Sequence, residues 1–150
     1  MKIAIGSDHS GYKLKEVIKK FLQENMYEVT DFGCYSEEAV DWPDIALLVA
    51  EAVKNKFVDI GILIDGFGGA VALAANKVKG IRAVCCYNTI SAKLARQHDD
   101  ANILCIGAKT VGELENIEIV KTFLSTQMLS EPRYLNRLKK LQDIEDKYFK

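Results

Sequence analysis

Cysteine and proline are scarce in this sequence, and their positions exclude several classes of protein. The four cysteines, Cys34, Cys85, Cys86 and Cys105, form neither a Cys-x-x-Cys pair nor a Cys/His cluster with zinc-ligand spacing, so we predict reduced thiols and no metal site. Only two prolines occur, and no Gly/Ser-rich, proline-rich or repetitive tract divides the 150 residues. We therefore expect a single domain over residues 1–150, long enough to bury its own core.

The sequence also lacks an excess of either charge. Lys and Arg number 20 against 21 Asp and Glu, which gives a formal net charge of -1. A protein that binds nucleic acid or an anionic membrane would need a basic excess, so we expect neither partner. The first residues, MKIAIGSDHS, turn polar too soon for a secretory signal, and we expect a cytoplasmic protein.

Apolar runs alternate regularly with helical patterns, which is typical of β-α units around a parallel sheet. Three of the apolar runs contain almost no polar residue, as expected for strands that are buried on both faces. The predicted strands cover residues 2–6, 28–32, 58–64, 81–85 and 102–106.

Helical spacing of apolar residues fills the intervals between these strands. The predicted helices cover residues 11–25, 43–54, 69–77, 88–97, 111–126 and 132–148. The simplest arrangement is an α/β fold with three layers, α/β/α, around a five-stranded parallel sheet. The extra C-terminal helix is heavily charged and follows the last strand, so we expect it to extend beyond the core and to contact another subunit.

Residues 60–75, IGILIDGFGGAVALAA, contain a single charge, that of Asp65. The stretch is too short to span a membrane, and its glycines predict a strand, a turn and a buried helix. Asp65 then ends a strand at the carboxyl edge of the sheet, where open α/β sheets bind ligands. Two interpretations follow. Asp65 caps the next helix, or it faces a ligand held by backbone N–H groups of Gly66, Gly68 and Gly69.

A dinucleotide site is the main alternative for this turn, and the residue spacing disfavours it. Val71 stands where the third glycine of Gly-x-Gly-x-x-Gly belongs. Cys85 and Cys86 stand about 20 residues further on, where an acidic ribose ligand belongs. No Gly-Lys-Ser/Thr follows, which excludes a P-loop. A nucleotide-binding, flavodoxin-like module is therefore a disfavoured hypothesis.

Three further groups of residues are candidates for a site. Asp8 and His9 follow the first strand, and a turn with a helix cap accounts for Asp8 but not for the histidine. His98 ends a helix, where compensation of the helix dipole is the alternative explanation. Arg133 and Arg137 are four residues apart and share a helix face, a spacing that suits a phosphate, although solvated arginines are commoner on such a helix.

Five segments occur in one order along nearly the whole chain: IAIGSDHSGYKLKE, VTDFGCYSEEAVDWPDIA, LIDGFGGAVALAANKVKGIRA, SAKLARQHDDANIL and PRYLNR. Together they resemble the ribose-5-phosphate isomerase B and galactose-6-phosphate isomerase family. The resemblance implies a Rossmann-like sheet of five parallel strands and an assembly of at least two subunits. It also implies that an aldose phosphate and a ketose phosphate are interconverted without a metal or another cofactor.

The same resemblance implies roles for individual residues. Asp8 would bind a sugar hydroxyl, and His98 would assist opening of the sugar ring. The phosphate would be held by His9, Arg133 and Arg137. Lys109 and Trp42 lie where the family often has a phosphate-binding arginine and a tyrosine. The turn that would hold the enediolate consists of Gly66, Phe67, Gly68, Gly69 and Ala70.

The sequence departs from the family pattern at positions that concern the chemistry. Asp65 stands where typical ribose-5-phosphate enzymes have the cysteine that moves the proton. Phe67 replaces a small hydroxyl residue and Ala70 a glycine, while Tyr87 and Asp99 replace a frequent histidine and asparagine. The Asp-x-Phe-Gly pattern is more similar to one of the two subunits of galactose-6-phosphate isomerase.

Two hypotheses for the function follow. The chain is an active isomerase with Asp65 as a carboxylate base, or it is a non-catalytic sugar-phosphate-binding subunit of a hetero-oligomeric enzyme. Apolar surroundings would raise the pKa of Asp65 and N–H groups would lower it. Asp65 and His9 are expected at one edge of the sheet and His98 at the other, so one chain would not join them. A two-fold homodimer, a tetramer of such dimers or a pair with a paralogous subunit would bring the two edges together.

Overall fold

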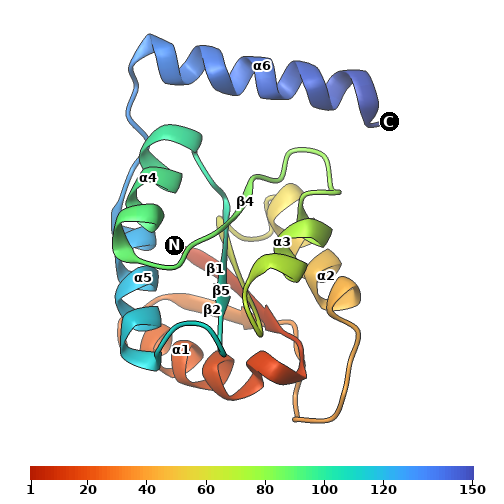
Figure 1. Cartoon of the computed structure of the whole chain (residues 1–150), viewed down its shortest axis with the longest axis vertical. Helices are drawn as coiled ribbons and strands as arrows, with labels where there is room; N and C mark the ends of the chain where they lie inside the picture. The colour runs from red at the N-terminus through yellow and green to blue at the C-terminus, as the bar shows by residue number, and fades with distance from the viewer.

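Five parallel strands form the centre of the molecule in the order β2-β1-β3-β5-β4 (Figure 1). The computed structural model describes all of residues 1–150. The strands are β1 (Lys2–Ser7), β2 (Glu28–Asp31), β3 (Ile60–Asp65), β4 (Ala83–Cys85) and β5 (Ile103–Gly107). Every pair of neighbouring strands is parallel, which confirms the predicted sheet.

Helices cover both faces of this sheet and form the two outer layers. Their bounds are η1 (His9–Gly11, a 3-10 turn), α1 (Tyr12–Glu24), α2 (Trp42–Lys54), α3 (Gly69–Ala75), α4 (Thr89–Asp99), α5 (Glu113–Ser125) and α6 (Pro132–Tyr148). In Figure 1, α1, α4 and α5 lie on one side of the sheet, and α2 and α3 lie on the other. None of these helices combines the length and apolar content that a membrane crossing requires.

Side chains that alternate along the strands build two apolar cores. Ile62 and Ile64 of β3 pack with α1, α4 and α5, whereas Leu63 packs with α2 and α3. All of β3 is buried, so both faces of the strand select apolar residues. The same alternation places Cys85 and Cys86 against opposite cores, and all four cysteines are free thiols.

Several predicted element boundaries are wrong by a few residues because side chains or neighbouring elements take up the backbone groups. Strand β4 begins at Ala83 rather than at residue 81, since the Arg82 N–H donates to the side-chain oxygen of Asn102 at 2.8 Å. Strand β3 begins at Ile60 rather than at residue 58, since the Val58 N–H donates to the Ala52 carbonyl in the last turn of α2. Helices α1, α2, α3, α4 and α5 likewise begin or end one or two residues away from their predicted bounds.

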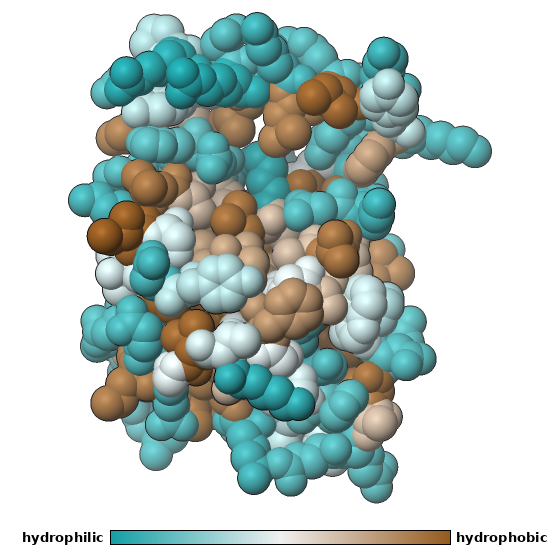
Figure 2. Space-filling view, in the orientation of Figure 1, coloured by the Kyte–Doolittle hydropathy of each residue, from teal (hydrophilic) through white to brown (hydrophobic).

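Helix α6 lies across the end of the molecule at which the strands begin (Figure 1). Tyr134 is its only buried residue. Near its far end, Asp146 pairs with Lys79 at 2.8 Å, and the Gly80 N–H donates to both carboxylate oxygens of Glu145 at 3.2 Å. Figure 2 shows hydrophilic residues along α6 and hydrophobic ones exposed beneath it. The predicted extension beyond the core is therefore confirmed.

Candidate active site

The candidate residues fall into two groups at opposite edges of the sheet. The larger group follows strand ends at the carboxyl edge: Asp8, His9, Trp42, Asp65, Gly66, Phe67, Gly68, Gly69, Ala70 and Lys109. The smaller group lies at the amino edge: His98, Asp99, Arg133 and Arg137. The fold brings each group together and does not join one group to the other.

Asp65 is the last residue of β3 and is only 2% exposed. Its carboxylate accepts a hydrogen bond from the Gly68 N–H, so it organises the turn that leads into α3. Burial raises the pKa of the Asp65 carboxyl above its ordinary value. The Gly68 N–H opposes this shift and the negative charge of Asp8 adds to it. Burial therefore decides the direction that the sequence left open.

The turn after Asp65 is held between β3 and β5 by its backbone. The Ala108 N–H donates to the Asp65 carbonyl at 2.9 Å, and the Lys109 N–H donates to the Gly66 carbonyl at 2.8 Å. Gly68 has a φ of +85°. A Cβ on Gly68 would also lie 2.5 Å from the Cys85 sulfur, so two independent constraints select glycine there.

Phe67 places an aromatic ring at the entrance to this turn. The side chain is 49% exposed, and the ring lies over Gly69 at the beginning of α3. A small residue at position 67 would leave this region open. The turn therefore differs in shape from one that carries a small hydroxyl residue.

Asp8 and His9 lie beside the turn because β1 and β3 are neighbours, and the Asp8 N–H donates to the Ile64 carbonyl at 3.2 Å. Asp8 Oδ1 accepts from the N–H groups of Ser10 and Gly11 at 3.0 and 3.1 Å. It also accepts from the Ser10 hydroxyl at 2.6 Å. Because Oδ1 makes all of these bonds, Oδ2 is the oxygen that can face a ligand.

His9 is exposed, and its Nδ1 accepts from the Val40 N–H at 3.3 Å. Val40 belongs to the segment that connects β2 to α2, and Trp42 follows at the first position of α2. Trp42 is exposed as well. The connection therefore contributes a backbone donor to the carboxyl-edge group, and the first residue of α2 contributes an aromatic side chain.

The amino-edge group is fixed where α4 ends. The Arg82 Nε donates to the Asp100 carbonyl at 2.9 Å, and Arg82 directly precedes β4. His98 therefore lies at the edge opposite to Asp65, as the antiparallel return of its helix predicts. Asp99 and Arg137 both line a crevice of about 420 Å³ between α6 and the body of the molecule.

His98, Arg133 and Arg137 all contact the ring of Tyr134. This ring stacks on that of His98, with centroids 4.5 Å apart and an interplanar angle of 12°. The guanidinium groups of Arg133 and Arg137 lie 4.8 and 5.9 Å from the same ring centroid. The Arg133 guanidinium also donates to the Tyr134 hydroxyl at 3.0 Å. Two arginines and a histidine thus share one surface.

Sequence reasoning missed several residues that shape these groups. The Cys85 thiol donates to the Phe67 carbonyl at 3.3 Å and lies under the turn. Burial raises the pKa of this thiol, and the charge of Asp65 acts in the same direction, so it is a protonated donor at neutral pH. Cys85 ends a strand at the carboxyl edge, and this position in the sequence could have marked it as a site residue. Tyr134 and Val40 carried no comparable signal.

No group of three or more His, Cys, Asp or Glu side chains could hold a metal ion.

Comparison with known proteins identifies the family. Residues 3–141 match the family described as Ribose/Galactose Isomerase. The chain belongs to this family. It is 44% identical over 147 residues to ribose-5-phosphate isomerase B of Escherichia coli, with 97% of each chain covered.

Solved structures of the ribose/galactose isomerase family share the fold. The TM-score is 0.97 with ribose-5-phosphate isomerase B of Clostridium thermocellum, at 49% identity and with 99% of each chain covered. It is 0.91 with the Mycoplasma genitalium enzyme, whose structure contains bound ribulose-5-phosphate, at 43% identity with 97% of this chain and 96% of that chain covered. The resemblance found in the sequence is confirmed, and the chain is an isomerase, that is, an intramolecular oxidoreductase.

Proposed function

We propose that the chain interconverts an aldose phosphate and its ketose isomer through an enediolate, with Asp65 as the base. Membership of the isomerase family supports the reaction class. The observation that carries the assignment of the base is the carboxylate of Asp65, which is buried at the carboxyl edge, bonded to a glycine-rich turn and raised in pKa. A raised pKa brings a carboxylate closer to the working pH, where a general base is most effective.

The proton transfer between C2 and C1 needs only one carboxylate, which acts first as base and then as acid. Asp65 removes the proton from C2 of the aldose, the C–H electrons form the C1–C2 double bond, and the carbonyl π electrons move onto O1, which gives the enediolate. The protonated carboxyl then returns the proton to C1, while the hydroxyl proton passes from O2 to O1. The carbonyl group has then moved to C2, and Asp65 is ionised again.

The turn from Gly66 to Ala70 supplies the electrostatic part of this proposal. Charge on the enediolate oxygens grows during proton removal, and fixed backbone N–H donors stabilise charge without reorganising. The backbone bonds to Ala108 and Lys109 hold the turn in place, which supports this use. Phe67 sets the shape of the sugar pocket beside these donors.

We further propose a composite site in a homodimer. In this arrangement Asp8 binds a sugar hydroxyl, and His9, Arg133 and Arg137 hold the phosphate, as the family resemblance implies. His98 assists ring opening. Since His9 and His98 lie at opposite edges of the sheet, a two-fold axis would bring the amino-edge group around Tyr134 of one subunit over the Asp65 turn of the other. A tetramer of dimers would preserve the same pairing.

An isomerase assay on the purified chain, run with aldose and ketose phosphates of four, five and six carbons, tests the proposal. Turnover of a pentose phosphate would assign the ribose-5-phosphate type, and turnover of a hexose 6-phosphate the galactose-6-phosphate type. If the chain binds sugar phosphates but turns over none of them, Asp65 is not a sufficient base. That result would favour a partner subunit of a hetero-oligomeric isomerase.

A further inference from the structure

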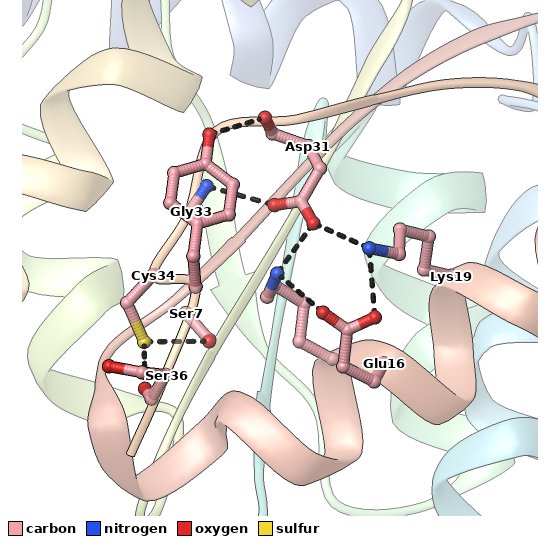
Figure 3. A network of polar contacts seen from close by, with 9 residues as sticks. Ser7, Glu16, Lys19, Asp31, Gly33, Cys34 and Ser36 are labelled. Atoms are coloured by element: carbon pink, nitrogen blue, oxygen red, sulfur yellow. Dashed lines mark hydrogen bonds and ion pairs between the residues drawn. The ribbon is translucent and has the colours of Figure 1, made fainter. Parts of the chain in front are cut away.

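A partly buried ionic network lies beneath the connection between β2 and α2, outside the groups described above (Figure 3). We call this connection, residues 32–41, the β2–α2 segment. The network joins α1 to the end of β2 through Lys15, Glu16, Lys19 and Asp31. The proposed chemistry uses none of these side chains.

Lys15 is the most unusual member of the network because its side chain is wholly buried. Its ammonium lies 2.6 Å from Asp31 Oδ2 and 3.3 Å from Glu16 Oε1. It also lies 5.4 Å from the ring centroids of both Tyr12 and Tyr35. Burying an ammonium is costly, and apolar replacement of a buried ion pair is often neutral or stabilising. The buried ammonium of Lys15 therefore indicates that this ion pair holds neighbouring parts of the chain in position.

Asp31 connects the network to the β2–α2 segment. Its Oδ2 accepts from Lys15 and from Lys19, the latter at 2.8 Å. Its Oδ1 accepts from the Gly33 N–H at 2.9 Å, and its carbonyl accepts from the Tyr35 hydroxyl at 3.0 Å. Burial would raise the pKa of this carboxyl, but the two ammonium groups and the N–H donor outweigh burial and lower it. Asp31 is thus a fixed anion that anchors the first turn of the segment.

The anchored turn is tied to β1 immediately before the site residues. The Ser7 N–H donates to the Gly33 carbonyl at 2.7 Å, and the Cys34 N–H donates to the Ser7 carbonyl at 2.8 Å. Further along the segment, the Val40 N–H donates to Nδ1 of His9 at 3.3 Å. The segment therefore runs from the buried ion pair to the ring of His9.

The bond from Val40 determines which nitrogen of His9 carries the proton. A neutral imidazole has one donor and one acceptor nitrogen, and Nδ1 is used here as the acceptor. The proton therefore resides on Nε2, which becomes a hydrogen-bond donor. Phosphate oxygens are acceptors, so this is the tautomer that a phosphate requires.

We propose that Lys15 and Asp31 are positioning residues for His9. They hold the β2–α2 segment so that the Val40 N–H fixes His9 with its proton on Nε2, presented to the substrate phosphate. The inference deepens the proposed function and rests on it, because the substrate contact of His9 belongs to that proposal.

Nitrogen NMR of the ring nitrogens tests the positioning directly. The chain has only two histidines, so the His9 and His98 signals are readily separated. The spectra are recorded at about pH 8 so that the neutral form of the imidazole is observed. In the unaltered protein His9 should show a protonated Nε2 and an unprotonated Nδ1. In Lys15→Met it should show a mixture of tautomers, while His98 stays unchanged.

Steady-state kinetics of the same variant test the link to binding. Lys15→Met should raise KM for the sugar phosphate about tenfold at nearly unchanged kcat, because a misdirected donor weakens one hydrogen bond to a charged group. Lys20→Met is the matched control. Lys20 lies on the same helix in an exposed pair with Glu24 and has no bond to the segment, so neither the spectrum nor KM should change.

Tyr35→Phe covers the case in which Lys15→Met does not fold. It removes only the exposed hydroxyl bond to the Asp31 carbonyl and should give a smaller change in the same direction. An unchanged His9 spectrum in the folded variant overturns the inference. A changed spectrum with unchanged KM supports the positioning of His9 and instead contradicts the phosphate contact assigned to it under the proposed function.

Discussion

Asp65 illustrates how surroundings convert an ordinary carboxylate into a candidate base. The position at the end of an apolar strand was readable from the sequence. The direction of its pKa shift was not, because burial and the Gly68 N–H act in opposite directions and their balance depends on packing. The thiol of Cys85 lies nearby but stays protonated, so the carboxylate is the better proton acceptor of the two.

Replacing Asp65 by asparagine removes the proposed base and keeps the size of the side chain. We expect turnover to fall by roughly 10²- to 10⁴-fold with sugar-phosphate affinity largely retained. Steady-state rates and a binding titration measure the two quantities separately. Near-normal turnover of Asp65→Asn would contradict the assignment of the base, and Asp65→Cys should retain part of the activity.

The pH dependence follows from the same shift. Because Asp65 must be ionised to accept a proton, kcat/KM should fall as the pH drops through its pKa, and burial places this acid limb above that of an ordinary aspartate. Asp8→Asn removes a negative charge that raises the pKa of Asp65, so it should move the limb to lower pH. Asparagine can still cap the 3-10 turn. Profiles of kcat/KM against pH for both proteins check the sign, and an upward movement would count against the proposal.

At the scale of elements, the turn between β3 and α3 depends on its glycines. Gly68→Ala forces a side chain into a left-handed conformation and against the Cys85 sulfur. We expect a loss of about 1–3 kcal/mol in the free energy of unfolding and a lower kcat, since the turn donors are displaced. Denaturant unfolding and kinetics measure both effects.

Gly80→Ala is the control for this prediction. Gly80 has a φ of +88°, but a Cβ there would meet no atom within 4 Å, and the residue lies at the amino edge. It should lose stability through backbone strain and leave the turn after Asp65 intact, so its loss of kcat should be much smaller than that of Gly68→Ala. An equal loss of kcat in both variants would show that general destabilisation, and not the geometry of the turn, explains Gly68→Ala.

The elements themselves were largely predictable, since burial on both sheet faces imposes apolar strands and burial on one face imposes helical spacing. The ends of strands also located Asp8 and Asp65. The contacts of irregular segments were not predictable. Val40 meets His9 through a backbone N–H, which any residue type provides. The stacking of Tyr134 on His98 depends on where the chain after α5 places α6.

At the scale of the whole molecule, the separation of the two groups predicts complementation between defective subunits. If the proposed composite site exists, Asp65→Asn and His98→Ala should each inactivate every site in a homodimer. After dissociation and reassociation of a mixture, about half of the dimers are mixed, and each of these has one intact site and one doubly defective site. About a quarter of the original activity should return. If one chain supplied both residues to a site, no activity would return.

The loose attachment of α6 has a consequence for hydrogen exchange. The helix buries only Tyr134 and is otherwise held by exposed bonds at Lys79 and Gly80, so it can detach without disturbing the sheet. Its amide hydrogens should exchange through this local opening, whereas those of β3 should exchange only on global unfolding. A partner subunit that covers α6 would slow the local opening and so the exchange of the α6 amides. The exchange of the β3 amides would still be governed by the free energy of global unfolding. Exchange along α6 would then depend on protein concentration and report dimer formation without any measurement of activity.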